Sequence, residues 1–226
     1  MFLDSQYILI MLVAMVLGFI TQGYVNSTYR KWSQVPLMTG RTGAEVARTM
    51  LDSEGLHAVG IETVPGHLTD HYDPRTNVLR LSTDVYSGRS VAAAGVAAHE
   101  AGHAVQHARG YVPAKIRMAL VPVANLGSGA AWVLIFIGLA IGFLQLAWLG
   151  VAAFATAVLF QLVTLPVEFN ASGHALRALS TTGALQPQQV SGARNVLTAA
   201  ALTYIAAALI SVMQLFYWMS VVGRRN

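Results

Sequence analysis

Cysteine is absent from this 226-residue sequence, which excludes disulfide bonds and thiolate metal ligands. Charge is also scarce, because Asp, Glu, Lys and Arg make up 11% of the residues, whereas a soluble globular domain carries about 25%. Hydrophobic residues make up 55%, so we expect much of the chain to face lipid. The net charge of +4 comes from scattered basic residues, which we interpret as topology signals and not as a nucleic-acid surface.

Three long stretches contain no charged residue: 5–29, 118–167 and 195–223. A helix that spans a membrane needs about 20 predominantly apolar residues. The first and last stretches therefore fit one span each, and the middle stretch fits two spans joined by a tight turn near Leu144–Leu149. The four predicted spans are Tyr7–Val25, Leu120–Gly142, Leu146–Val163 and Ala199–Met219.

The basic residues also predict an orientation. Most of them lie in the two polar segments that follow the first and third spans. With four spans these segments share one side of the membrane, and the positive-inside rule makes that side cytoplasmic. Arg224 and Arg225 follow the last span and fall on the other side, against the rule.

Two helices are predicted in the larger polar segment from their end signals. Thr42 and Glu45 form a capping box before an apolar run, and Gly55 stands where that helix should end. Ser90 caps a second predicted helix over Val91–Arg109.

The chain between these two helices predicts extended structure. Val78–Ser82 is a short strand candidate, and the residues around Asp73-Pro74 and Thr76-Asn77 have turn chemistry. We place His71 and Tyr72 in the turn, as weak candidates to support a nearby site. An exposed strand can hold an extended peptide by main-chain pairing, and the alternative is a strand paired only within the fold.

The second predicted helix carries the sequence His99-Glu100-Ala101-Gly102-His103. Residues four apart on a helix project from one face, so both imidazoles can bind a single zinc ion. Glu100 lies beside His99, where it can reach a water next to the metal and act as general base. The segment therefore predicts a catalytic zinc site; the competing interpretation is two polar histidines that satisfy each other or water.

A catalytic zinc ion usually has three protein ligands. Glu168 is the only acidic residue after Glu100, and a hairpin of two spans would return it to the neighbourhood of the zinc helix. We therefore predict Glu168 as the third ligand; the alternative is a carboxylate paired with Arg177 or an interfacial Lys.

Two further histidines are candidate site residues besides Glu168. His107 continues the four-residue series, but three such residues drift around a straight helix, so we interpret it as a polar face residue or a hydrogen-bond partner of a ligand. His174 follows Glu168 by six residues, and it is a candidate transition-state hydrogen-bond donor or an alternative ligand.

Taken together, these residues resemble the YugP-type bacterial membrane zinc metallopeptidases over nearly the whole chain. The likeness is carried by Thr42–Ala47, Leu68–Pro74, Leu81-Ser82 and Ala97–His107. The chain is more distantly similar to the HtpX and CAAX prenyl protease gluzincins, whose third zinc ligand lies in a motif Glu-aromatic-x-Ala-Asp. Glu168-Phe169-Asn170-Ala171 matches this motif, and Ser172 takes the place of the Asp. The resemblance implies gluzincin chemistry at a cytoplasm-facing site in the bacterial inner membrane.

The predicted fold is a mainly α integral membrane protein with a small α+β zincin-like catalytic region, which holds the HExxH helix and a short edge strand. We expect one domain, with the parts 7–25 (span), 30–118 (catalytic), 120–163 (hairpin), 164–198 (third ligand) and 199–219 (span).

The predicted function is a zinc-dependent endopeptidase of membrane-associated or misfolded proteins. Its Zn²⁺ ligands are His99, His103 and Glu168, and its catalytic residues are Glu100 and His174. The alternative is a non-proteolytic membrane scaffold or adaptor with a structural zinc site, which normally has four protein ligands. The expected partners are a peptide or protein substrate and the lipid bilayer, with no nucleic acid, and no feature sets the oligomeric state.

Overall fold

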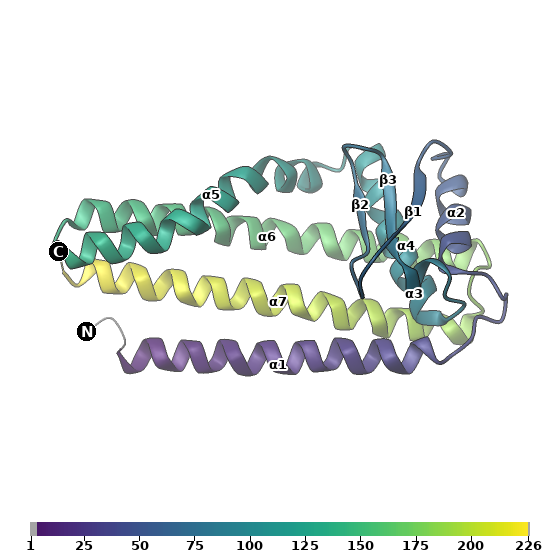
Figure 1. The fold of residues 1–226 in the computed structure, drawn as a ribbon, viewed down its shortest axis with the longest axis horizontal. Helices are drawn as coiled ribbons and strands as arrows, with labels where there is room; N and C mark the ends of the chain where they lie inside the picture. Colours follow the sequence, from purple (N-terminus) through teal and green to yellow (C-terminus); the bar gives the residue numbers. More distant parts are fainter. Residues whose placement is uncertain (1–3, 226) are drawn as a thin grey trace. The chain divides into compact units, whose positions relative to one another are not determined.

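The fold is described for residues 4–225 from a computed structural model (Figure 1). A small mixed region of short helices and strands lies between the first and second of the long helices in the chain. In chain order the elements are α1 (Ser5–Ser33), α2 (Gly43–Ser53), β1 (Gly60–Val64), β2 (His71–Asp73), β3 (Val78–Ser82), α3 (Thr83–Tyr86), α4 (Val91–Ala108), α5 (Val112–Ala140), α6 (Leu144–Thr181) and α7 (Pro187–Gly223).

The helices α1, α5, α6 and α7 are each long and apolar enough to cross a membrane, which agrees with the four predicted spans. The predicted position of the turn in the hairpin was wrong. Residues Leu144–Leu149 form the start of α6, and the turn lies between Ala140 and Leu144. The reason is Gly142, whose φ of +72° is the left-handed conformation that ends many helices.

The described chain divides into two compact units. The first unit comprises the residues up to Thr21, Val112–Pro166 and the residues from Thr203 onward. The second unit comprises Gln22–Tyr111 and Val167–Leu202. The helices α1, α6 and α7 each contribute one part to either unit.

The first unit is packed by aromatic and small residues. Its main core is formed by residues of α5, α6 and α7, namely Ile135, Leu139, Ala147, Val151, Tyr217, Trp218 and Val222. The backbones of α5 and α6 approach so closely that a Cβ on Gly138 would lie 2.4 Å from the Ala147 nitrogen. Close approach at small residues is how apolar helices associate in lipid.

The second unit is built on α2, α4 and the sheet. The capping box at Thr42 is present, since its hydroxyl accepts from the Glu45 N–H and the Glu45 carboxylate accepts from the Thr42 N–H. The helix then ends before Gly55, which has a φ of +76°. Its buried face packs against α4 and consists of Gly43, Val46, Ala47, Met50 and Leu51.

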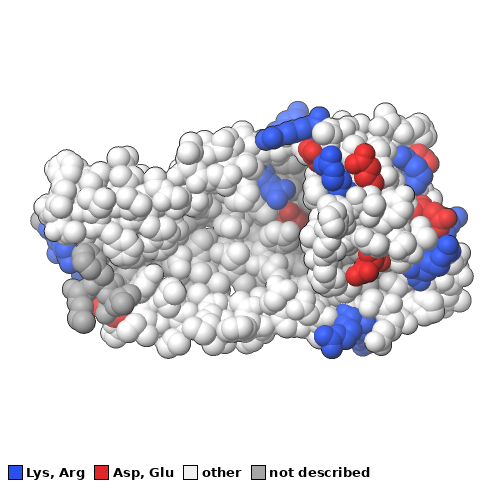
Figure 2. All heavy atoms as spheres, in the orientation of Figure 1, with Lys and Arg blue, Asp and Glu red and all other residues white. Residues whose placement is uncertain are grey.

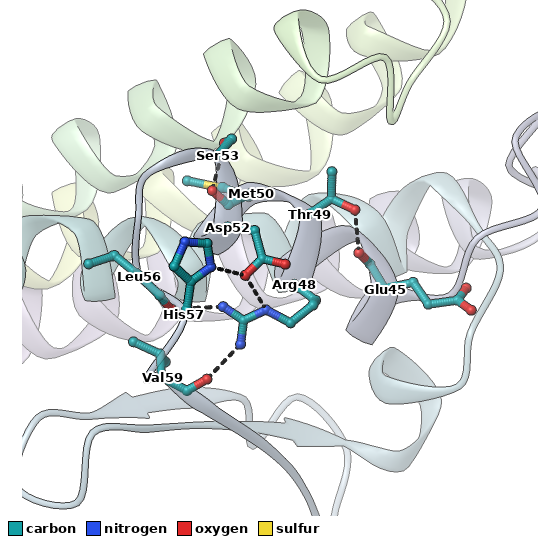
Figure 3. A network of polar contacts seen from close by, with 9 residues as sticks. All are labelled: Glu45, Arg48, Thr49, Met50, Asp52, Ser53, Leu56, His57 and Val59. Atoms are coloured by element: carbon teal, nitrogen blue, oxygen red, sulfur yellow. Dashed lines mark hydrogen bonds and ion pairs between the residues drawn. The ribbon is translucent and has the colours of Figure 1, made fainter.

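Arg48 connects α2 by hydrogen bonds to the segment that precedes β1 (Figure 3). Its guanidinium donates to the carbonyl oxygens of Val59 at 2.7 Å and Leu56 at 2.8 Å. The Nε atom pairs with Asp52 at 2.9 Å. These bonds fix the loop between the helix and the sheet.

The sheet has the order β1-β3-β2, with β3 parallel to β1 and antiparallel to β2. The strand predicted at Val78–Ser82 is therefore present as β3, but the prediction that it lies at an edge was wrong. It is the central strand, because Gly60–Val64 forms an additional strand on its other side. Leu79 and Leu81 are fully buried, as expected of an interior strand.

His71–Asp73 forms the strand β2, so its assignment to a turn was also wrong. The turn starts after Asp73, whose carboxylate accepts from the Arg75 N–H and the Thr76 hydroxyl. The turn ends at Asn77, which has a φ of +56°.

Charged side chains gather over the second unit (Figure 2). Nine of the ten acidic residues belong to it, and Asp4 is the exception. The face of the first unit in this view is largely white, as expected for helices that contact lipid.

Candidate metal centre

The helix α4 is suited to a buried position. Its N-cap Ser90 accepts from the Ala93 N–H, and its sequence is rich in Ala and Gly. At Gly102 a Cβ would lie 2.6 Å from the Ala171 carbonyl oxygen of α6. The two helix backbones are therefore nearly in contact at this point, which brings the segment around Ala171 against the histidine-bearing face of α4.

His99 and His103 lie on that face as predicted. Their ring centroids are 4.8 Å apart, and the ring planes are nearly perpendicular at 84°. Ligand atoms of His99, Glu100 and His103 all lie within 4.8 Å of one another. The two imidazoles can therefore share one metal ion, with the Glu100 carboxylate beside it.

Glu168 reaches the same position from α6. Its Oε2 lies 3.1 Å from His99 Nε2 and 3.6 Å from His103 Nε2. Only 3% of Glu168 is exposed. The structure therefore brings the three predicted zinc ligands together, with both Nε2 atoms directed at one carboxylate oxygen.

The electrostatics of the centre follow from its burial. Burial raises the pKa of Glu100, although the neighbouring His103 and His99 partly oppose this effect. Burial by itself lowers the pKa of His103, but the hydrogen bond with Glu168 and the negative charges of Glu100 and Glu168 outweigh it and raise the pKa overall. A carboxylate that holds its proton more tightly than usual is suited to exchange protons during catalysis.

Three polar residues of this centre were missed as site residues in the sequence. Ser172 Oγ lies 3.1 Å from His99 Nδ1, and Gln106 Oε1 lies 3.0 Å from His103 Nδ1. The Gln106 amide also donates to Asn170 Oδ1 at 2.9 Å. Gln106 could have been noticed as a polar residue in a helix of small apolar ones, and Ser172 occupies the motif position that holds Asp in the gluzincins.

The other histidines lie elsewhere in the second unit. His174 is half-buried and interacts electrostatically with Arg109, Glu54 and Arg177, near the end of α4 where Arg109 pairs with Glu54. Its catalytic role stays a prediction. His107 is exposed, and its ring lies 5.9 Å from the Tyr72 ring of β2.

The donor set fits zinc. Two imidazole nitrogens and a carboxylate oxygen form one of the known catalytic sets for this ion. All three side chains are nearly buried, with side-chain exposures of 12%, 15% and 3% for His99, His103 and Glu168. Burial together with convergence on one oxygen distinguishes this group from a chance cluster of surface acids.

Two comparisons with known proteins return matches over nearly the whole chain. The chain matches the family described as "Putative neutral zinc metallopeptidase" over residues 7–223. It is 46% identical over 215 residues to the "Putative membrane protease YugP" of Bacillus subtilis (strain 168), covering 95% of this chain and 96% of that protein. No solved structure matches the chain significantly.

Proposed function

Because the chain belongs to the neutral zinc metallopeptidase family, we propose that it hydrolyses peptide bonds at a zinc site formed by His99, His103 and Glu168. The observation that carries this proposal is the position of Glu168 Oε2, within 3.1 Å and 3.6 Å of the two Nε2 atoms. Glu168 follows His99 by 69 positions and His103 by 65 positions in the sequence. The three side chains nevertheless meet at one point, as the ligands of a single ion must.

A bound zinc ion supplies Lewis-acid chemistry, which lowers the pKa of water and polarises a carbonyl group. Glu100 is placed beside the same point. Its carboxylate takes a proton from the attacking water and later gives that proton to the leaving amine nitrogen. The raised pKa of Glu100 makes its carboxylate a stronger base, which favours the first of these transfers.

The substrate is proposed to bind as an extended peptide along β2. This strand lies at an edge of the sheet, packs against α4 and contacts it through Tyr72 and His107. Main-chain groups on an edge strand can pair with a peptide of any sequence. Such pairing suits a peptidase that removes membrane-associated or misfolded proteins at the cytoplasmic face of the bacterial membrane.

The substitution Glu100→Gln tests the mechanism. It removes the proton acceptor and keeps the side-chain volume, so we expect peptide hydrolysis to fall at least about 1,000-fold while one zinc ion per chain is retained. Zinc is measured by elemental analysis of the detergent-purified protein, and cleavage with an unfolded membrane-protein substrate.

Two variants complete this test. Glu62→Gln makes the same chemical change at an exposed position of β1 and should leave both zinc content and hydrolysis unchanged. Glu168→Ala should lose zinc. Hydrolysis that persists in zinc-loaded Glu100→Gln protein would refute the mechanism, and wild-type protein that binds zinc but cleaves no peptide would favour the scaffold alternative.

A further inference from the structure

Gln106 is a buried amide whose hydrogen-bonding groups all have partners. Only 2% of the residue is exposed. Its Nε2 donates to the Val167 carbonyl oxygen at 2.7 Å and to Asn170 Oδ1 at 2.9 Å. Its Oε1 lies 3.0 Å from His103 Nδ1. One side chain of α4 thus contacts a proposed zinc ligand and two residues of α6.

These contacts fix which way the amide faces. The Val167 carbonyl oxygen can only accept a hydrogen bond, so the NH₂ group of Gln106 must face it. The opposite orientation would set two oxygen atoms against each other in a buried site. Gln106 Oε1 therefore faces His103, and because that oxygen can only accept, His103 Nδ1 must carry a proton.

His99 has a different partner. Its Nδ1 contacts the Ser172 hydroxyl, which can either donate or accept. Ser172 therefore leaves the protonation of Nδ1 open, whereas Gln106 does not. Of the two histidines, only His103 has a hydrogen-bond partner that requires a proton on Nδ1.

We propose that Gln106 is a positioning residue that keeps the proton of His103 on Nδ1 and thereby directs the Nε2 lone pair to the zinc site, while anchoring α4 to the segment of α6 that carries Glu168. The role in zinc binding rests on the proposed function. The proton placement does not, since it follows from the hydrogen bonds alone.

The expected size of the effect comes from metal sites in general. A histidine ligand usually donates its second N–H to a neighbouring acceptor, and removal of that acceptor typically weakens metal binding by about 10–100-fold. Gln106→Met keeps the volume of the side chain and removes all three hydrogen bonds. Gln106→Glu keeps an acceptor for the His103 proton and loses the donors to α6.

Gln189 offers a matched control in the same unit. It is also buried, with 5% exposed, and its amide bonds to the Pro36 carbonyl oxygen at 2.8 Å and the Met38 N–H at 3.4 Å. Gln189→Met therefore removes the hydrogen bonds of a buried glutamine without touching a histidine. Any general loss of stability should appear in this variant as well.

The first measurement is the zinc dissociation constant of the full-length protein in detergent, by competition with a chelator. We expect Gln106→Met to bind zinc about 10–100-fold more weakly than wild type and Gln189→Met to match wild type. Gln106→Glu should recover part of that loss, because it restores the acceptor for His103 but sets an oxygen atom against the Val167 carbonyl oxygen. Equal affinities of Gln106→Met and wild type would overturn the zinc-positioning role. If Gln106→Met does not fold, Asn170→Ala removes one of the two anchors of the amide and should show a smaller loss of the same sign.

The second measurement uses metal-free protein labelled with ¹⁵N-histidine, with the His103 signal assigned by substitution. We expect the His103 Nδ1 proton to exchange slowly with water in wild type and Gln106→Glu, and faster in Gln106→Met. Equal exchange in wild type and Gln106→Met would overturn the proton placement. Because this readout needs neither zinc nor peptide cleavage, it separates failure of the inference from failure of the proposed function.

Discussion

The two units of this chain hold their helices together in different ways. In the first unit the contacts are aromatic rings around Trp218 and close backbone approaches at glycines such as Gly138. In the second unit polar side chains such as Gln106 and Glu168 are buried within an apolar shell. In lipid, burial of apolar surface gives little driving force for helix association, so shape must supply it. A unit outside lipid gains from apolar burial and can therefore hold polar groups inside, provided that each is paired.

This comparison predicts that zinc stabilises only the second unit. If free zinc is held at 1,000 times its dissociation constant, removal of the ion should lower the stability of that unit by about 4 kcal/mol. It should also abolish hydrolysis. Hydrogen exchange resolved by peptide checks this, since exchange should rise in α4 and in 167–202 and stay unchanged in 203–223. Equal changes in both units would show that they respond to zinc as one body.

The substitution Trp218→Ala should lower the stability of the first unit and leave the second unit unchanged. The Trp218 ring is fully buried and lies 5.4 Å from Phe136 and 5.6 Å from Trp132. Loss of such a ring destabilises a protein by about 3–5 kcal/mol, and we expect the lower end because lipid reduces the transfer contribution. Thermal unfolding in detergent measures the change, and zinc affinity should remain that of wild type.

Trp218→Phe is the matched control for this variant. The indole N–H of Trp218 has no hydrogen-bond partner among residues 4–225, so Phe keeps most of the ring contacts and sacrifices no polar bond. We expect less than half the destabilisation of the Ala variant. A similar loss in both variants would mean that the shape of the indole, and not the presence of a ring, holds this unit.

The substitution Gly102→Ala asks whether the second unit also depends on close backbone approach. The new methyl group would lie 2.6 Å from the Ala171 carbonyl oxygen, so α4 and α6 must separate. We expect a destabilisation of about 2 kcal/mol and weaker zinc binding, measured by thermal unfolding and chelator competition. At Gly95 of the same helix the methyl group would meet Ala193 at 3.6 Å, which is an ordinary contact. Gly95→Ala should therefore be neutral or slightly stabilising, and a loss of zinc in both variants would count against the contact at Ala171 as the cause.

The smallest expected effect is that of the substitution Asp73→Asn, at the end of β2 in the second unit. The hydrogen bond from Arg80, followed by those from the Arg75 N–H and the Thr76 hydroxyl, holds the pKa of Asp73 well below its ordinary value of 3.8. Because the pKa is lowered in the folded state, the carboxylate contributes stability above pH 3.8 and loses that contribution as pH falls further. Asp73→Asn should be slightly less stable than wild type at pH 7, and the difference should shrink in acid. A difference independent of pH would show that charge is not its origin.

The features predicted correctly from the sequence are those that depend on neighbouring residues. The capping box at Thr42 and the cap at Ser90 need partners only three residues away. The four apolar helices follow from their composition, and the shared face of His99 and His103 follows from helix geometry.

The features that were missed depend on contacts between distant segments. The central position of β3 requires its parallel pairing with Gly60–Val64, a segment that is not adjacent to it in the chain. The contacts of Gln106 and Ser172 depend on the rotation of α6, which is apolar on most faces and therefore has no periodicity that sets one face toward α4. Glu168 was predicted near the histidines because it is the only acidic residue after Glu100 and because a hairpin would return it there.

The two unspecified positions of the HExxH pattern are filled here by Ala101 and Gly102, both buried against neighbouring elements. In a designed protein these positions would be free to vary, because the chemistry requires only the two histidines and the glutamate. In this scaffold they determine whether a second helix can come close enough to deliver its carboxylate. Transplanting the site into another protein would therefore require copying the small residues together with the proposed ligands. The small size of these residues sets the spacing between the two helices.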